Sequence, residues 1–166
     1  MKFLLDSNIF IEAKNRYYGF DICPGFWDWI DHVCANDVAS IVEVRDELID
    51  GRDDLADWIT ARNEVAWFLR VDDDATQSNF VEVADHVSNA GYTASAVAKF
   101  LSKADPWLIA KAITLGATIV THETVGQPSA KNRVMIPNVC VNFGVPCLDT
   151  FDALRQMSAS FMLHRI

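Results

Sequence analysis

The chain has 166 residues, of which 51% are hydrophobic and 22% charged, and its formal net charge is −9 at pH 7. A chain of this length can bury most of its apolar surface, so we expect one domain over residues 1–166. The composition excludes a disordered protein, and every apolar run is shorter than the ~20 residues that a membrane-spanning helix needs. The N-terminus lacks the pattern of a signal peptide, which predicts a cytoplasmic location.

The charge balance and the cysteines restrict the chemistry further. The chain has 14 basic and 23 acidic residues, which counts against non-specific binding of nucleic acid, since phosphates must be neutralised by Lys and Arg. A cluster of carboxylates that binds Mg²⁺ would change this balance, so the acidity does not exclude a nucleic-acid enzyme. The cysteines show neither a C-x-x-C pair nor a histidine at zinc-binding spacing, which predicts buried thiols: Cys23, Cys34, Cys140 and Cys147.

The first informative segment is the N-terminus, where a short apolar run ends in a carboxylate. Residues 3–5 have the pattern of a strand buried on both faces, and Asp6 follows directly. Apolar residues then resume at helical spacing. Ligands of open α/β sheets bind outside the carboxyl ends of the strands, so Asp6 is a candidate site residue. The alternative is that Asp6 or Ser7 merely caps the next helix.

Residues 14–23 carry two cations and two tyrosines. Basic residues interleaved with aromatic ones can bind nucleic acid, whereas an ordinary loop packed down by its aromatic side chains is the alternative. Apolar residues then recur at helical intervals over 26–35, and Val38 with Ala39 predicts a minimal second strand.

Two glutamates follow this second strand. Ser40 and Glu43 have the spacing of a capping box, which predicts a helix that begins here. The helix should run to about Asp50, with Gly51 as its stop. Because Glu43 would be used in the cap, Glu47 is the freer carboxylate for chemistry. Glu43 would lie closer to the edge of the sheet and is the reserve candidate.

The middle of the chain is expected to be largely helical. We expect a helix over 52–65, a short buried segment at 67–69, and helices over 75–89 and 94–101. The aspartates at 72–74 resemble a metal cluster at first sight. Adjacent aspartates point in different directions, however, so we interpret this run as the cap of the helix that follows.

A second carboxylate stands at the start of a buried helix. Asp105 at the N-cap with Pro106 at the first helical position predicts a helix that continues to about residue 115. A buried strand at 117–120 then leads to Glu123. In a βαβ unit the helix begins at the edge where strands end, so Asp6, Asp105 and Glu123 should share one edge of the sheet.

The remaining chain closes the domain. Residues 124–133 form a loop beside that edge, in which Lys131 and Arg133 are candidates for contact with substrate phosphates, with solubility as the alternative. We expect a turn or helix from Ile136, a last strand over 144–148, and a closing helix capped at Asp149.

Taken in order, these elements resemble the PIN domain over most of the chain. The matching segments are Leu4-Leu5-Asp6-Ser7-Asn8, Glu47-Leu48-Ile49-Asp50-Gly51, Asp105-Pro106-Trp107-Leu108-Ile109-Ala110 and Ala117-Thr118-Ile119-Val120-Thr121-His122-Glu123. The longer sequence, including residues 12–18 and 131–147, is similar to a PIN-like branch catalogued as a domain of unknown function. Members of that branch are regarded as candidate toxins of toxin–antitoxin pairs.

The resemblance implies a three-layer α/β/α fold with a short, mostly parallel central sheet. It also implies Mg²⁺- or Mn²⁺-dependent cleavage of RNA phosphodiesters, with an acidic cluster of catalytic and metal-binding residues formed by Asp6, Glu47, Asp105 and Glu123. The last acids of PIN nucleases are usually aspartates, so Glu123 is a departure from the pattern. Mg²⁺ takes oxygen ligands and retains several waters, which agrees with a site of a few carboxylates.

The implied partners are an RNA substrate and an antitoxin that covers the acidic cleft with a basic side chain; a homodimer is left open, and no membrane is involved. Asn8 could bond a carboxylate or the scissile phosphate, or merely stabilise a turn. A phosphatase with an aspartyl nucleophile would need Asp where Asn8 stands, so that class is disfavoured. The main alternative is a non-catalytic interaction protein that retains the fold.

Overall fold

The computed structural model describes residues 2–34, 36–62, 66–127 and 129–162. They form a five-stranded sheet in which every pair of neighbours is parallel, in the order β3-β2-β1-β4-β5. The strands are β1 (Phe3–Leu5), β2 (Val38–Ile41), β3 (Phe68–Leu69), β4 (Thr118–Val120) and β5 (Cys147–Leu148).

Strand β1 lies at the centre of the sheet because all three of its residues are apolar. Leu4 pairs with Ala39 of β2 on one side and with Ile119 of β4 on the other. All three side chains are buried. A strand covered on both faces reads as a continuous apolar run rather than an alternating one, which is why the sequence identified it.

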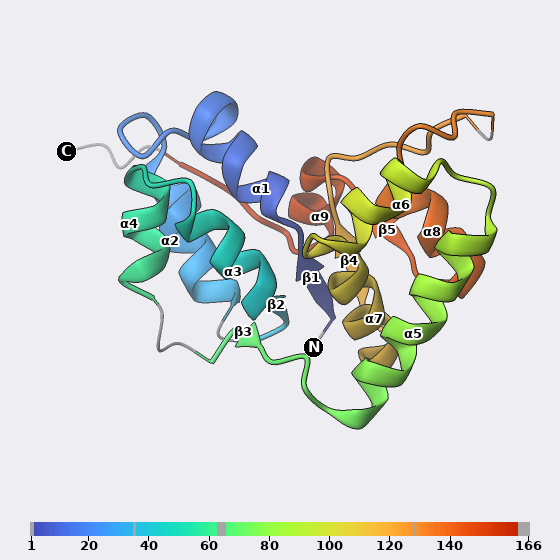
Figure 1. The fold of residues 1–166 in the computed structure, drawn as a ribbon. Helices are drawn as coiled ribbons and strands as arrows, with labels where there is room; N and C mark the ends of the chain where they lie inside the picture. The colour runs from blue at the N-terminus through green and yellow to red at the C-terminus, as the bar shows by residue number, and fades with distance from the viewer. Residues whose placement is uncertain (1, 35, 63–65, 128, 163–166) are drawn as a thin grey trace.

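Helices cover both faces of the sheet, as Figure 1 shows. One layer begins with α1 (Ser7–Glu12), which continues into a π-helical turn, η1 (Ala13–Tyr17), and includes α2 (Pro24–Val33), α3 (Val42–Ile49) and α4 (Asp54–Thr60). The other layer holds α5 (Asp74–Asn89), α6 (Ala94–Leu101), α7 (Asp105–Leu115) and α8 (Ile136–Phe143). The last helix, α9 (Thr150–Gln156), follows β5.

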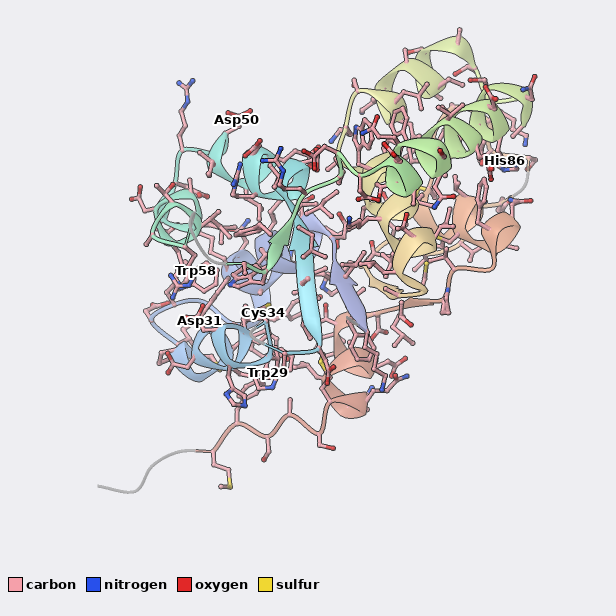
Figure 2. All side chains as sticks on the ribbon, turned by 90° about the horizontal axis from the view of Figure 1, so that it is seen from below. Trp29, Asp31, Cys34, Asp50, Trp58 and His86 are labelled. Carbon is pink, nitrogen blue, oxygen red and sulfur yellow. The ribbon has the colours of Figure 1, made fainter. Side chains whose placement is uncertain are left out.

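The predicted three-layer α/β/α fold with a parallel sheet is therefore confirmed. Helix α7 is the most buried helix of the second layer, as its apolar sequence predicted, and Leu108 and Ile109 are fully enclosed between the sheet and α5. Figure 2 shows the two groups of helices from below, with Asp31 and Trp58 in the first group and His86 of α5 in the second. No described helix has the length and apolarity to cross a membrane. The single-domain assignment stays a prediction.

The predicted capping box at Ser40 is wrong. Ser40 belongs to β2, and its hydroxyl donates a 2.7 Å hydrogen bond to the carbonyl oxygen of Leu5. Helix α3 begins only at Val42, and the residue at its N-cap, Ile41, offers no side-chain bond. The pairing of two buried strands has overridden a local pattern, so Glu43 has no role in a cap.

Asp105 is also not the N-cap that its position before Pro106 predicted. It is the first residue of α7, whose N-cap is Ala104, and its carboxylate makes no hydrogen bond to any described residue. Gly51 does not end α3 in a left-handed conformation; Arg52 has the positive φ, of 53°. The helix expected over 52–65 is shorter, and residues 63–65 lie outside the described part of the chain.

Several local predictions are confirmed. Asp73 caps α5 by accepting hydrogen bonds from the backbone and hydroxyl of Thr76, so the aspartate run is a cap rather than a metal cluster. Asp149 caps α9, and Gly116 ends α7 with a φ of 61°. The four cysteines are free thiols, as predicted, but only Cys34 and Cys140 are buried; Cys23 and Cys147 are partly exposed, so the prediction of burial is wrong for these two.

Candidate active site

The candidate site lies at the carboxyl edge of the two central strands. Asp6 follows β1 and Thr121 follows β4, and the backbone N–H of Asp6 donates to the carbonyl oxygen of Val120 at 3.0 Å. The parallel pairing of the two strands thus brings together residues that are 115 positions apart in the sequence. The first turn of α7, with Asp105, lies at the same edge.

Asp6 is a buried carboxylate, with 3% of its surface exposed. The Thr121 hydroxyl donates to Oδ2 at 2.8 Å, and the Ser7 hydroxyl donates to Oδ1 at 3.3 Å. Burial raises the pKa of Asp6 to about 6, against the opposing effect of the Thr121 bond. The negative charges of Glu123 and Glu47 raise this pKa further. Asp6 therefore lies in a cluster of negative charges with Glu123 and Glu47.

Asp105 is half-buried and feels the same cluster. Burial raises its pKa to about 7, and the charges of Asp6, Glu123 and Glu47 add to the increase. Lys103 acts in the opposite direction. A carboxyl whose pKa is raised by burial and by the charges of several neighbouring carboxylates is typical of functional sites.

The structure places Glu47, rather than Glu43, near these aspartates. Oε1 of Glu47 accepts a 3.0 Å hydrogen bond from the backbone N–H of Ala104, the residue before α7. The charge of Glu47 raises the pKa of both aspartates. The charged residues that influence the pKa of Glu43 are instead Asp46, Arg45 and Asp72. One oxygen of Glu43 is buried with no partner among the described residues, and burial raises the pKa of this carboxyl.

Glu123 is bound on both of its carboxylate oxygens. Arg133 donates to Oε1 at 2.7 Å, and the backbone N–H of Ile136 donates to Oε2 at 2.7 Å. Glu123 thus fixes the start of α8 and the end of the loop that precedes it. Its side chain lines the cleft at the edge of the sheet, but it offers no free oxygen in this conformation.

Thr121 is the central residue that the sequence did not predict as functional. Besides donating to Asp6, its hydroxyl accepts from the Asn8 amide at 3.0 Å and from the backbone N–H of Glu123 at 3.1 Å. The side-chain oxygen of Asn8 accepts from the backbone N–H of His122 at 3.0 Å. Asn8 therefore joins the segments after β1 and β4. The only signal of this network in the sequence was a polar run after each strand.

Asp6, Asn8, Asp105 and Glu123 line a cleft of about 430 Å³, which we call the acidic cleft. Glu47 does not line this cleft; it lines a neighbouring pocket, together with Lys103 and Ala104. The charged side chains at its wall are Asp6, Asp105, Glu123, Lys99, Lys103 and Arg133. Lys99 and Lys103 form no ion pair with any residue that the structure describes. Lys131 has a structural role instead: it donates to the carbonyl oxygen of Ala90 at 2.9 Å and lies over the ring of Tyr92.

The carboxylates fit a hard divalent cation in part. Asp6 and Asp105 supply uncompensated carboxylate oxygens, the ligands that Mg²⁺ and Mn²⁺ prefer. Glu47 and Glu123 each hold a backbone N–H. Within the described residues no group of three or more His, Cys, Asp or Glu side chains is arranged as a metal site. The donor chemistry agrees with Mg²⁺, while the full set of four ligands is not preassembled.

Comparison with known proteins identifies the fold and the family. The structure resembles that of VapBC2 from Rickettsia felis, which was crystallised with a DNA fragment from the VapBC2 promoter. The TM-score is 0.53 and the sequence identity 14%, and the match covers 90% of this chain and 98% of that one. It also resembles FitAcB from Neisseria gonorrhoeae, with a TM-score of 0.52 and 16% identity over 88% of this chain and 96% of that one.

At such low identity the likeness concerns the fold, which is PIN-like as the sequence predicted. No curated protein matches the sequence. Residues 3–161 match the family described as "Domain of unknown function (DUF4411)". The match covers almost the whole chain, and the protein therefore belongs to the DUF4411 family.

Proposed function

We propose that this protein is a metal-dependent ribonuclease, the toxin of a toxin–antitoxin pair, that hydrolyses RNA phosphodiesters in the acidic cleft. One observation carries the proposal. Asp6, which follows β1, is buried, and Asp105, which begins α7, is half-buried; the two share a cleft with lysines that form no ion pair with any described carboxylate. A purely structural pair of buried acids would be expected to have cationic partners.

The site residues have distinct roles in this proposal. Asp6 and Asp105 would hold Mg²⁺ or Mn²⁺ directly, with Asp6 oriented by the Thr121 hydroxyl. Glu47 would orient the attacking water or add a ligand, and Glu123 would join the set when it releases Arg133. A bound divalent ion supplies a water of lowered pKa and stabilises the leaving oxygen of a phosphodiester.

Cations at the wall of the cleft answer the objection from the net charge of −9. Lys99 lies in α6 and Lys103 just after it, on the same wall as Asp105. Each could neutralise one substrate phosphate, the contact on which binding of a nucleic-acid backbone depends. The phosphate contacts are thus assigned to Lys99 and Lys103, with Arg133, and no longer to Lys131.

The proposal of a toxin includes an antitoxin partner. The PIN-like branch that the sequence resembles is regarded as a source of toxins, and the fold resembles that of VapBC2, which was crystallised with promoter DNA. An antitoxin would inhibit by placing a basic side chain beside Asp6 and Asp105. A complex with its cognate partner that leaves the acidic cleft open would contradict this part of the proposal.

A non-catalytic interaction protein is the second candidate, and one observation favours it. Glu123 accepts hydrogen bonds on both carboxylate oxygens and Glu47 accepts one on Oε1, so two of the four predicted acids already hold backbone N–H groups. In that case the cleft would bind a basic segment of a partner, and a divalent ion would have no effect on RNA.

Incubation of purified protein with total cellular RNA and Mg²⁺ or Mn²⁺ distinguishes the two candidates. The ribonuclease predicts cleavage that EDTA abolishes and that Asp6→Asn and Asp105→Asn both lose. Asp28→Asn, at an exposed position of α2, is the matched control and should cleave like wild type. Equal RNA patterns for all four proteins with and without metal would favour the interaction protein.

A further inference from the structure

Three partly exposed rings lie together, and one of them belongs to the residue directly before Glu123 of the acidic cleft, although none of the three lines the cleft itself. They are Tyr17 at the end of η1, His122 after β4, and Phe151 in the first turn of α9. The Tyr17 ring lies 5.9 Å from that of His122 and 5.4 Å from that of Phe151, measured between centroids. Tyr17 is 46% exposed and Phe151 is 36% exposed. We call these three residues the aromatic platform.

The exposure of the platform contrasts with the packing of the neighbouring aromatic residues. Tyr18, the next residue along the chain, stacks on the buried ring of Phe26 at 4.4 Å. The chain reaches Tyr17 through a π-helical turn, closed by a 2.6 Å bond from the backbone N–H of Tyr18 to the carbonyl oxygen of Ala13. π-Helical turns are rare and occur frequently at functional sites. Here the turn places one tyrosine in the core and leaves its neighbour at the surface.

The platform is held in place by the same segments that build the cleft. His122 lies between Thr121 and Glu123, and its backbone N–H donates to Asn8. Its ring nitrogen Nε2 forms a 2.9 Å hydrogen bond with the Thr150 hydroxyl, which joins it to the start of α9 beside Phe151. The His122 ring is therefore held in a fixed position, and His122 directly follows Thr121, whose hydroxyl bonds Asp6.

We propose that Tyr17, His122 and Phe151 form a base-stacking platform that holds an unpaired nucleobase of the RNA next to the phosphate bound in the acidic cleft. The inference rests on the proposed ribonuclease function and extends it to a base-binding subsite. Aromatic rings stack on the faces of bases in many single-strand binding proteins, and this contact tolerates any base. The protein would then select single-stranded RNA, because a paired base cannot present its face.

The size of the platform favours a nucleobase over a protein partner. A standard protein interface buries roughly 800 Å² on each side, whereas a whole aromatic side chain buries only about 150–250 Å². Three rings that are already partly covered offer far less area than such an interface requires. The cations of η1 do not add to the area, since Lys14 pairs with Asp53 and Arg16 pairs with Glu12.

A binding experiment in a non-cleaving background tests the platform. The probe is a short single-stranded RNA that carries 2-aminopurine, added to Asp6→Asn protein in Mg²⁺ buffer. Stacking should quench the fluorescence of the probe. Tyr17→Ala should weaken binding roughly 5- to 100-fold and remove the quenching, because it deletes a stacking face. Phe151→Ala should also weaken binding, because the Phe151 ring packs at 80° against Tyr17 and borders the same site. Tyr17→Phe should retain both, and Val141→Ala, exposed on α8, is the control for general surface effects.

The outcomes separate the platform from the ribonuclease itself. If wild type cleaves RNA while both alanine variants retain the KM and the quenching, the platform is wrong and the ribonuclease stands. If wild type neither cleaves nor binds the probe, both are wrong. Unchanged RNA binding together with loss of a purified protein partner in the alanine variants would assign the platform to protein recognition. Thermal melts of each variant identify any that fail to fold.

Discussion

Replacing Asp6 by Asn should stabilise the metal-free protein at neutral pH while abolishing its proposed activity. The pKa of Asp6 is raised from 3.8 to about 6 in the folded state, chiefly by burial. The folded state therefore binds the proton more tightly than the unfolded state does. The contribution of the Asp6 carboxyl to stability is therefore largest below pH 3.8, falls as the pH rises through about 6, and is then constant. Asn pays no such cost, and its side-chain oxygen can still accept from the Thr121 hydroxyl.

The magnitude follows from the size of the shift. Each pKa unit corresponds to about 1.4 kcal/mol, so a shift of about two units makes the ionised carboxylate cost about 3 kcal/mol above pH 7. The free energy of unfolding of Asp6→Asn should exceed that of wild type by up to that amount at pH 8, and the difference should vanish near pH 4. Asp28→Asn should differ little from wild type at any pH.

Urea unfolding in EDTA between pH 4 and pH 8 measures these differences. Addition of Mg²⁺ should then stabilise wild type by mass action and leave Asp6→Asn unchanged. The reasoning would be refuted if Asp6→Asn were less stable than wild type at pH 8, or if its advantage did not depend on pH. Either result would mean that the carboxylate is compensated by a partner that the structure does not show.

Thr121→Val should destabilise the protein by about 1–3 kcal/mol and reduce cleavage at least tenfold, because the Asn8 amide and the Glu123 backbone N–H lose their acceptor. Thr118→Val, in the strand that precedes Thr121, is the control, and equal activity of the two variants would contradict a role for this hydrogen-bond network. Lys99→Ala and Lys103→Ala should each raise KM and lower the salt dependence of RNA binding by about one ion. Lys131→Ala should instead reduce stability and leave the salt dependence of RNA binding unchanged. A lower salt dependence for Lys131→Ala, with none for Lys99→Ala and Lys103→Ala, would assign the phosphate contact to Lys131.

Local patterns predicted the parts of the fold that depend on neighbours in sequence. The apolar run before Asp6 and the apolar surface of α7 identified a central strand and a buried helix. Together with the parallel topology they placed Asp6 and Asp105 at one edge. These features are visible in a short window because burial on all sides leaves a continuous apolar pattern.

The errors arose where a distant contact decides the outcome. Ser40 looked like a helix cap, yet its hydroxyl bonds to Leu5 of the neighbouring strand. The roles of Thr121 and Glu123 depend on partners that the sequence alone does not bring together, since Thr121 meets Asp6 and Asn8 across more than a hundred residues. The exposure of Tyr17 depends on a π-helical turn, which no local pattern in the sequence predicted.

The most direct test of the account is the rate of Mg²⁺-dependent cleavage of a single-stranded RNA by wild type and by Asp105→Asn, measured on samples whose melts show that both are folded. The account predicts that wild type cleaves and that the variant loses at least a hundredfold in rate while melting at the same or a higher temperature. Cleavage at equal rates by the two folded proteins would contradict the assignment of the acidic cleft as the active site.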